Sequence, residues 1–282
     1  MSAPSVADQR PVVAPTLGFR RRLLDNTVVR NVGPFMPIVL LWWLIAELEV
    51  FPSAFFVGPD VVAVRLVELS RNGILTGYLA DSLYRLGTGV LVGLLVGGVF
   101  GLIIGLSRVA RRFAWPLLVF FQAIGDIAWL PLLIVWFGFS LLSVTAVIVY
   151  TVVFPLALSI TAGIASVPED MRRASASLGA GRWQTLTEVV LPGALPGVVS
   201  GMRTGLGYGW RALIAAEIIV GTSGIGFMMF DARRVGEVTD VFLGMIVLGV
   251  LWYALDALIL APLERETVER WGMVRRPAAA AK

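Results

Sequence analysis

The sequence contains no cysteine and no histidine, and its single lysine is the last residue, Lys282. Disulfide bridges, proton relays through histidine, and zinc or haem sites built on these residues are therefore excluded. A Walker A loop needs the pattern G-x4-G-K-[ST], so the chain cannot bind ATP by such a loop. Charged residues are also scarce, at 15% of the 282 residues, which is low for a soluble domain.

Apolar residues dominate instead. They make up 57% of the chain, and the mean hydropathy is +0.84. About 20 consecutive apolar residues cross the hydrocarbon core of a bilayer as a helix. The composition therefore predicts an all-α, multi-pass membrane protein with six transmembrane helices, at about 34–51, 80–106, 114–137, 141–165, 195–220 and 241–263.

The net charge is +4, and almost all of the positively charged residues are arginines. The distribution of these arginines along the chain predicts how the protein is oriented in the membrane. With six spans, one side of the membrane holds Arg10, Arg20, Arg21, Arg22, Arg30, Arg108, Arg111, Arg112, Arg172, Arg173, Arg182, Arg265, Arg270, Arg275 and Arg276. The other side holds Arg65, Arg71, Arg233 and Arg234, with Arg85 near it. By the positive-inside rule, the richer side and both termini are cytoplasmic. We expect tails at 1–30 and 272–282 around a six-helix transmembrane domain at 31–271.

One long interior stretch, 172–192, reads as helical and yet is too polar for a bilayer. It predicts a short helix, a break at Gly179 or Gly181, a second short helix and a stop at Pro192. Met171, Ala174 and Leu178 form an apolar stripe on the first helix. Such a helical hairpin either contacts a partner protein or is an ordinary loop exposed to water.

This stretch resembles the cytoplasmic signature loop of ABC importer permeases, E-A-A-x3-G-A-x5-F-x2-I-x-L-P. The matching positions are Arg173, Ala174, Ser175, Gly179, Ala180, Leu186, Val189, Leu191 and Pro192. Leu178 and Trp183 lie within the same loop, at 167–194. Segments around Trp129 to Gly138, Gly201 to Arg203, Ala216-Glu217 and Leu263 to Arg265 resemble the nitrate/sulfonate/taurine branch. The resemblance extends from Phe51 to Trp271, and Arg173 departs from the acidic residue of the family.

The resemblance implies a type I ABC importer permease in a bacterial inner membrane. Its partners would be two ATPase subunits that carry ATP and Mg²⁺, a second permease (most simply an identical copy) and an extracytoplasmic binding protein. The implied cargo is a small polar ion such as nitrate, a sulfonate, taurine or an aromatic acid. No cofactor is expected on this chain and no nucleic acid among its partners, and the alternatives are a stand-alone secondary transporter and a membrane-embedded enzyme.

Two spans carry glycine at every fourth residue. The residues are Gly89, Gly93, Gly97, Gly101 and Gly105 in one, and Gly193, Gly197, Gly201, Gly205 and Gly209 in the other. Such stripes let helix backbones approach closely in a membrane. They predict tight helix contacts or, alternatively, surfaces that slide during gating.

Polar groups at membrane depth are candidates for a substrate pathway, since each charge there costs about 3 kcal/mol on insertion scales. They are Gln122, Asp126, Trp129, Arg203, Arg211 and Glu217. Asp126 and Arg211 are expected to face the translocation cavity, either paired or on two sides of a polar substrate; a structural ion pair is the alternative. Arg203 is expected to snorkel to the interface, and Glu217 to face water near the outer end.

Two outer segments complete the prediction. Residues 59–72 form either a short amphipathic helix along the membrane surface or a plain loop. The polar, turn-rich stretch at 221–234 either receives the binding protein, as the resemblance implies, or is a loop without a partner.

Overall fold

The computed structural model describes residues 33–264. The predicted tails lie outside these residues, as does the end of the predicted transmembrane domain, 265–271. The chain divides into two units, Met1–Asp60 and Val61–Lys282, which are described separately. We call the second the main unit.

In the first unit, a single 3-10 turn (η1, Gly33–Phe35) leads into helix α3, Met36–Glu47. The indole nitrogen of Trp42 donates to the carbonyl of Val57 at 2.9 Å, which ties the following turn back to the helix. At 1.5 Å per residue, the 12 residues of α3 are about 18 Å long, short of the roughly 30 Å of a bilayer core. The predicted span at 34–51 is therefore not a full-length helix by itself.

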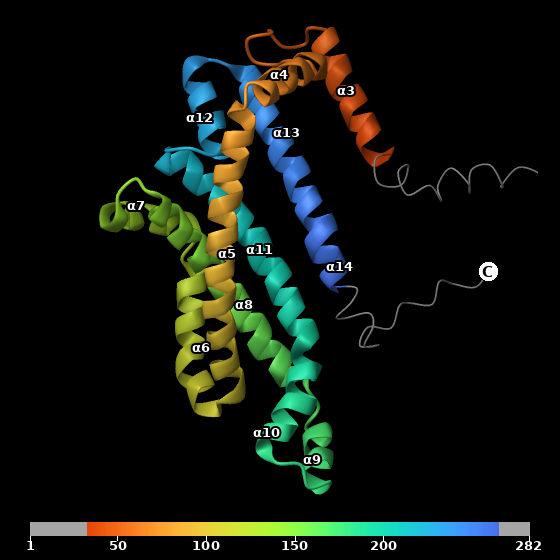
Figure 1. Ribbon diagram of the computed structural model, residues 1–282, viewed down its shortest axis with the longest axis vertical. Coiled ribbons are helices and arrows are strands. Elements are labelled where there is room, and N and C mark those ends of the chain that lie inside the picture. Colours follow the sequence, from red (N-terminus) through yellow and green to blue (C-terminus); the bar gives the residue numbers. More distant parts are fainter. Residues whose placement is uncertain (1–32, 265–282) are drawn as a thin grey trace, which may run out of the picture. The chain divides into compact units, whose positions relative to one another are not determined.

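The main unit contains four helical stretches long and apolar enough to cross a membrane (Figure 1). They are α5 (Ile74–Leu106), α8 (Leu141–Ser166), Arg182–Val220 and Val238–Glu264. The last two combine α10 (Arg182–Thr185), η2 (Leu186–Val190) and α11 (Leu191–Val220), and then α13 (Val238–Leu255), η3 (Asp256–Leu260) and α14 (Ala261–Glu264). The described chain has no strand, which confirms the all-α class, and the predicted spans at 80–106, 141–165, 195–220 and 241–263 lie within these four.

The predicted span at 114–137 is instead two helices, α6 (Arg108–Ala123) and α7 (Asp126–Phe137), bent by 89°. Ile124 and Gly125 have ψ angles of 109° and 144°, outside the helical range, and so they break the helix. If this bent pair counts as one span, the described chain has five candidate spans rather than six.

Helix α8 lies between α5 and α11 and packs most extensively against both. The two glycine stripes make this possible. A Cβ built at Gly97 would lie 2.9 Å from the Val153 carbonyl oxygen, and one at Gly197 would lie 2.7 Å from the Gly163 Cα. Both grooves therefore receive α8 backbone, which confirms the prediction of tight helix contacts.

The polar stretch forms α9 (Glu169–Ser177), a turn at Gly179, and α10. The predicted stop at Pro192 is wrong, because the chain continues from α10 through the π-helical turn η2 into α11. Pro192 lies directly after this π-helical turn, where the hydrogen-bonding pattern of the helix changes, and so it does not end the helix.

At the opposite end of α5 the amphipathic helix is confirmed as α4, Pro59–Arg71, which buries Val62 and Leu69. Arg65 on α4 binds Asp240 at the start of α13, with nitrogen–oxygen distances of 2.7 and 2.9 Å. This hydrogen bonding to Asp240, and secondly to Glu68, raises the pKa of Arg65 above its usual value. The remaining helix at this end is α12, Ile225–Val235.

Candidate functional site

The loop between α8 and α11 is held in one conformation by a few local contacts. Gly179 has a φ of +83°, a left-handed conformation that glycine adopts without strain and that ends α9. The hydroxyls of Ser175 and Thr185 lie 3.1 Å apart and join α9 to α10. Arg172 donates to the carbonyl of Ile164 at 2.6 Å and anchors α9 to the end of α8. We call residues Glu169–Val190 the coupling segment.

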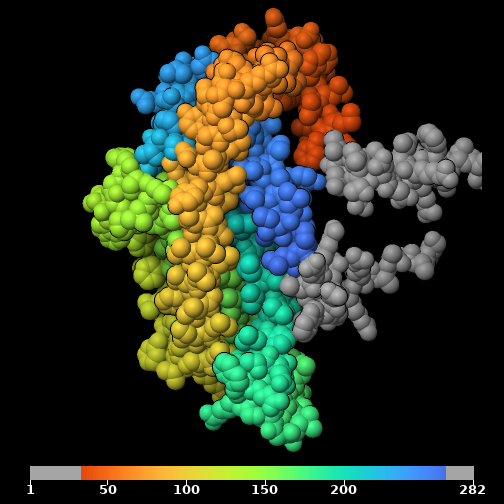
Figure 2. Space-filling model, viewed as in Figure 1, coloured from red at the N-terminus to blue at the C-terminus, as the bar shows by residue number. Residues whose placement is uncertain are grey.

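The coupling segment exposes large apolar side chains that touch little of their own chain. Leu178 is 89% exposed and Trp183 is 75% exposed. Figure 2 shows the segment, in green, projecting as a knob at the lower end of the main unit. Arg173 forms an exposed ion pair with Glu169 at 3.1 Å. Ala174 is exposed and Ser175 and Ala180 are half-buried, whereas Leu191 and Pro192 belong to α11.

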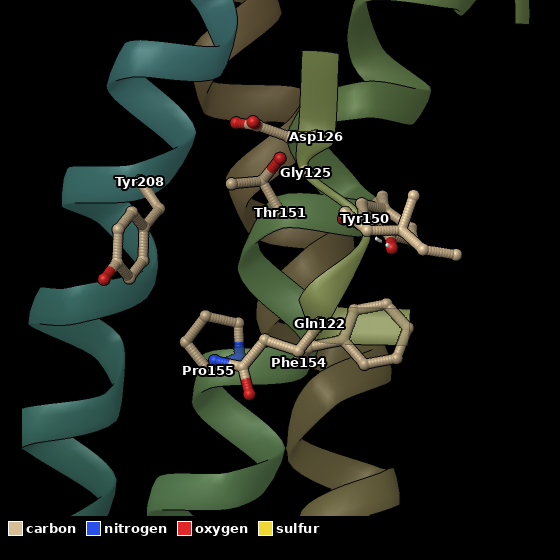
Figure 3. Close-up of a pocket in the computed structure, with 9 residues that line it drawn as sticks. Gln122, Gly125, Asp126, Tyr150, Thr151, Phe154, Pro155 and Tyr208 are labelled. Atoms are coloured by element: carbon tan, nitrogen blue, oxygen red, sulfur yellow. Dashed lines mark hydrogen bonds between the residues drawn. The ribbon is translucent and has the colours of Figure 1, made fainter. Parts of the chain in front are cut away.

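A second candidate site is a cavity of about 220 Å³ at the bend between α6 and α7. Figure 3 shows Asp126 and Thr151 directed toward α11, from which Tyr208 projects. Its lining residues come from four helices and the bend: Gln122, Ile124, Gly125, Asp126, Tyr150, Thr151, Phe154, Pro155 and Tyr208. The helix break thus places a carboxylate, an amide and hydroxyl groups around one small space.

Of the predicted pathway residues, Gln122 and Asp126 line this cavity. Trp129 does not; its ring packs on that of Tyr150 at 5.2 Å between centroids, and its buried indole nitrogen has no hydrogen-bond partner in the described chain. Arg211 lies next to the cavity, with its guanidinium carbon 5.8 Å from the centroid of the Tyr208 ring. No ion pair joins Asp126 to Arg211 within residues 33–264.

Three polar residues of the cavity, Tyr150, Thr151 and Tyr208, were not among the predicted pathway residues. The hydroxyl of Tyr150 donates to the carbonyl of Phe121 in the last turn of α6, which also accepts from the Ile124 amide. Tyr208 stands four residues after Thr204 and three before Arg211 on one exposed face of α11. That i, i+4, i+7 polar spacing in an apolar helix is the signal that could have identified Tyr208.

Arg203 is not a free, snorkelling cation. Its guanidinium binds Asp256 at 2.9 Å and also pairs with Glu264, both from the last helical stretch. It therefore joins α11 to that stretch, as expected for intramembrane charges, which generally pair.

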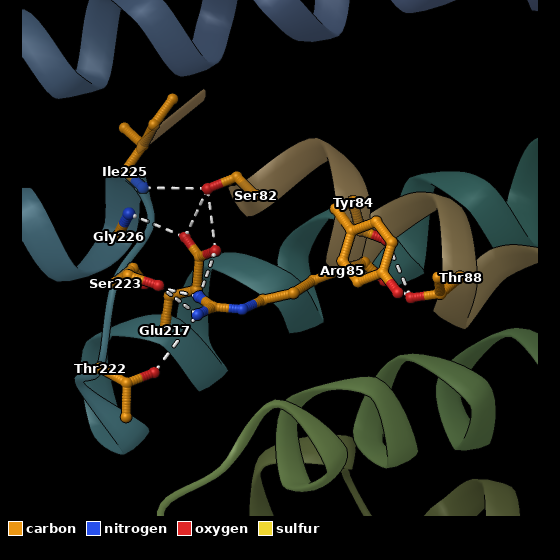
Figure 4. A network of polar contacts seen from close by, with 9 residues as sticks. All are labelled: Ser82, Tyr84, Arg85, Thr88, Glu217, Thr222, Ser223, Ile225 and Gly226. Atoms are coloured by element: carbon orange, nitrogen blue, oxygen red, sulfur yellow. Dashed lines mark hydrogen bonds and ion pairs between the residues drawn. The ribbon is translucent and has the colours of Figure 1, made fainter. Parts of the chain in front are cut away.

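Glu217 was expected to face water, and this is wrong, because its side chain is completely buried. Ser82 donates to both carboxylate oxygens at 2.8 and 2.9 Å, Arg85 lies 3.1 Å away, and the Gly226 amide donates at 2.9 Å. Arg85 also donates to Ser223 and Thr222 (Figure 4). This network connects α5, α11 and the start of α12.

The geometry of these sites suits binding better than a reaction. No group of three or more metal-ligating side chains occurs in the part of the chain that the structure covers. The cavity joins one carboxylate to hydroxyl and amide groups, which can bind a small polar molecule by hydrogen bonds.

Comparison with known proteins decides the family. Residues 89–261 match the family described as binding-protein-dependent transport system inner membrane component. This chain belongs to that family. This permease is 33% identical over 257 residues to the taurine transport system permease protein TauC of Escherichia coli (strain K12). The alignment covers 89% of this chain and 93% of TauC.

Other relatives of this permease are named for the transport of other solutes. It is 31% identical to the putative aliphatic sulfonates transport permease protein SsuC of Bacillus subtilis (strain 168), over 79% of this chain and 80% of SsuC. It is 33% identical to the bicarbonate transport system permease protein CmpB of Synechococcus elongatus (strain ATCC 33912 / PCC 7942 / FACHB-805), over 68% of this chain and 70% of CmpB. The chain is thus a permease component of an ABC transport system and not itself an enzyme.

The fold of this permease has a counterpart among solved structures. An inward-facing conformation of the MetNI methionine ABC transporter includes a chain that aligns with a TM-score of 0.53 and 20% identity. The alignment covers 67% of this permease and 95% of that chain. The shared fold, the family match and the apolar helices together establish a multi-pass inner membrane protein.

Proposed function

We propose that this permease forms the translocation pathway of an ABC importer and is moved by a separate ATPase that binds residues 173–192. The observation that carries the proposal is the coupling segment. It presents Leu178 and Trp183, 89% and 75% exposed, on a projecting hairpin. Exposed large apolar side chains on such a projection are typical of a protein interface. Arg173, where the family has an acidic residue, already pairs with Glu169 and would not serve as an acidic contact.

The assembly that we propose has two copies of the permease, two ATPase subunits carrying ATP and Mg²⁺, and a binding protein. The coupling segment would face the cytoplasm, because the described arginines Arg108, Arg111, Arg112, Arg172, Arg173 and Arg182 gather at its end of the main unit. The binding protein would then approach the end formed by α12. Both chain termini would be cytoplasmic.

The cargo that we propose is a small polar solute of the taurine, sulfonate, nitrate or related organic-acid type. The names of TauC and SsuC support the taurine and sulfonate part of this range. The cavity at the α6–α7 bend, with Asp126 inside it and Arg211 beside Tyr208, would contact the solute during passage. An acid and a base that are not paired with each other can bind opposite ends of a zwitterion, as in an amino sulfonate.

Transport would follow from a two-state change. ATP binding would close the ATPase pair, draw two coupling segments together and turn the cavity outward, and hydrolysis would reset it. Such coupling requires that the ATPase binds the coupling segment differently in the two states.

Reconstituted uptake tests this function. The permease, its ATPase and the binding protein would be placed in proteoliposomes with the solute that the binding protein retains. We expect uptake only with ATP and the binding protein, and none when Leu178→Glu and Trp183→Glu are combined. Uptake driven by an ion gradient without the ATPase would instead establish a secondary transporter and contradict the proposal.

A further inference from the structure

A second, larger cavity lies away from the α6–α7 bend, between the first half of α6 and the end of α8. It has a volume of about 540 Å³, and its lining includes Arg108, Arg111, Arg112 and Trp115 from α6. These four residues stand at i, i+3, i+4 and i+7, so they share one face of the helix. The opposite wall comes from α8 and consists of Thr161, Ala162 and Ala165. We call this cavity the arginine groove.

Within the described part of the chain, no other side chain compensates the charge of the arginine groove. No hydrogen bond or ion pair links Arg108, Arg111 or Arg112 to another side chain in residues 33–264. No carboxylate from these residues lines the groove either. Three guanidinium groups at one place repel each other, and an anion among them relieves that repulsion.

Apart from the arginines, the lining of the groove is mostly apolar. Trp115, Pro116, Ala162 and Ala165 contribute to it, and Thr161 already donates its hydroxyl to the Ala157 carbonyl at 2.8 Å. We call the part lined by the arginines the mouth and the part lined by these apolar residues the floor; the mouth is cationic, and the floor has few free hydrogen-bonding groups. A hydrocarbon chain fits that floor better than a soluble phosphate or a polar peptide does.

The arginines of the groove lie at the end of a membrane-spanning helix, where lipid headgroups are expected. The arginines begin directly after α5 ends at Leu106, and Ser107 is the only residue between the two helices. Gly105 of the same helix end packs against Ile164, near the α8 carbonyl that anchors the coupling segment. The mouth of the groove thus lies where a membrane-spanning helix meets water, on the face that carries the coupling segment.

We infer that the arginine groove binds an anionic phospholipid, with the headgroup phosphate among Arg108, Arg111 and Arg112 and one acyl chain along Trp115 and the α8 alanines. Basic pockets between membrane helices recognise anionic headgroups in this way, and arginine pairs with phosphate through two parallel N–H donors. The interaction does not depend on the solute that is transported.

The test uses Trp115 as a reporter in the full-length permease. The protein is reconstituted into nanodiscs that contain brominated phosphatidylglycerol or brominated phosphatidylcholine, because bromine quenches tryptophan on contact. The contribution of Trp115 is the difference between the wild type and Trp115→Phe. A triple variant, R108Q/R111Q/R112Q, removes the charges, and R71Q/R233Q/R234Q removes three arginines elsewhere as the matched control.

We expect Trp115 to be quenched more effectively by phosphatidylglycerol, with a preference of about ten-fold or more, since each cation near an anionic surface adds about 1 kcal/mol or five-fold. The preference should disappear in the triple arginine variant and persist in the control variant. Millimolar inorganic phosphate should not reduce it, because a free ion lacks the acyl chain. Relief of quenching by inorganic phosphate would instead assign the site to a soluble anion.

Two further results would overturn the inference. Equal quenching by both lipids in the wild type would show that the arginines do not select an anionic headgroup. Absence of quenching by either lipid would show that protein, such as a second copy of the permease, covers the groove. Both results need only the wild type and Trp115→Phe, so the inference remains testable even if the triple variant fails to fold.

Discussion

Two neighbouring glycines in α5 should respond in opposite directions to the same substitution. A Cβ at Gly97 would lie 2.9 Å from the Val153 carbonyl oxygen and 3.0 Å from the Val153 Cα, whereas a Cβ at Gly98 would meet nothing within 4 Å. The Val153 atoms are backbone, so α5 and α8 must separate to accept Gly97→Ala. Gly98→Ala needs no such movement.

The expected size follows from two opposing contributions. Overpacking costs about 1–3 kcal/mol, and backbone contacts favour the upper part of that range. Replacing glycine by alanine within a helix stabilises the helix by about 1 kcal/mol. Gly97→Ala should therefore lower the free energy of unfolding by about 2 kcal/mol, and Gly98→Ala should raise it by up to about 1 kcal/mol. At about 2–4 °C per kcal/mol for a domain of this size, the two denaturation midpoints should differ by roughly 6–12 °C.

The assay is thermal denaturation of the purified permease in detergent, followed by the fraction that remains monodisperse at one fixed heating rate. Gly87→Ala is the matched control, because a Cβ there also meets nothing within 4 Å. If Gly97→Ala and Gly98→Ala shifted the midpoint equally, the account of α5 and α8 as a glycine-mediated contact would be refuted.

The remaining predictions concern charged residues. Glu217→Ala should lower the free energy of unfolding by about 3–5 kcal/mol, since it leaves Arg85 buried without its ion-pair partner, and a thermal midpoint equal to wild type would contradict this. Arg203→Leu should destabilise by only about 1 kcal/mol, because that side chain is 45% exposed, and the same denaturation assay checks it. Asp126→Asn and Arg211→Leu should each reduce ATP-driven uptake at least about ten-fold without changing the midpoint; full uptake in both would remove them from the pathway.

The hydropathy of the sequence predicted where the long helices lie, but it did not predict where a span bends. Spans such as Leu141–Ser166 are recognised because length and apolar composition are both properties of the sequence. The 89° bend at Ile124 and Gly125 is not such a property, since the window through it remains apolar whichever way the chain turns. For the same reason, a 12-residue helix in a longer apolar stretch was read as a complete span.

The sites divide in a similar way. The two short helices and the glycine turn of the coupling segment were predicted by spacing, because its residues are close in sequence and its glycine break has a local cause; its contact with an ATPase stays a prediction. The burial of Glu217 was not, since Ser82 and Arg85 are 135 and 132 residues away in the chain. The rule that intramembrane charges pair would have suggested Arg85, but only the fold brings the two side chains together.

Cross-linking from the coupling segment tests the central claim most directly. Because the sequence has no cysteine, Ser177→Cys introduces a unique thiol on the exposed end of α9, and Arg234→Cys introduces one on α12 as the control. With a short bifunctional reagent in whole membranes, we predict that Ser177→Cys captures the ATPase subunit and that Arg234→Cys does not. Capture of the ATPase from Arg234→Cys alone would contradict the assignment of the coupling segment as the ATPase contact.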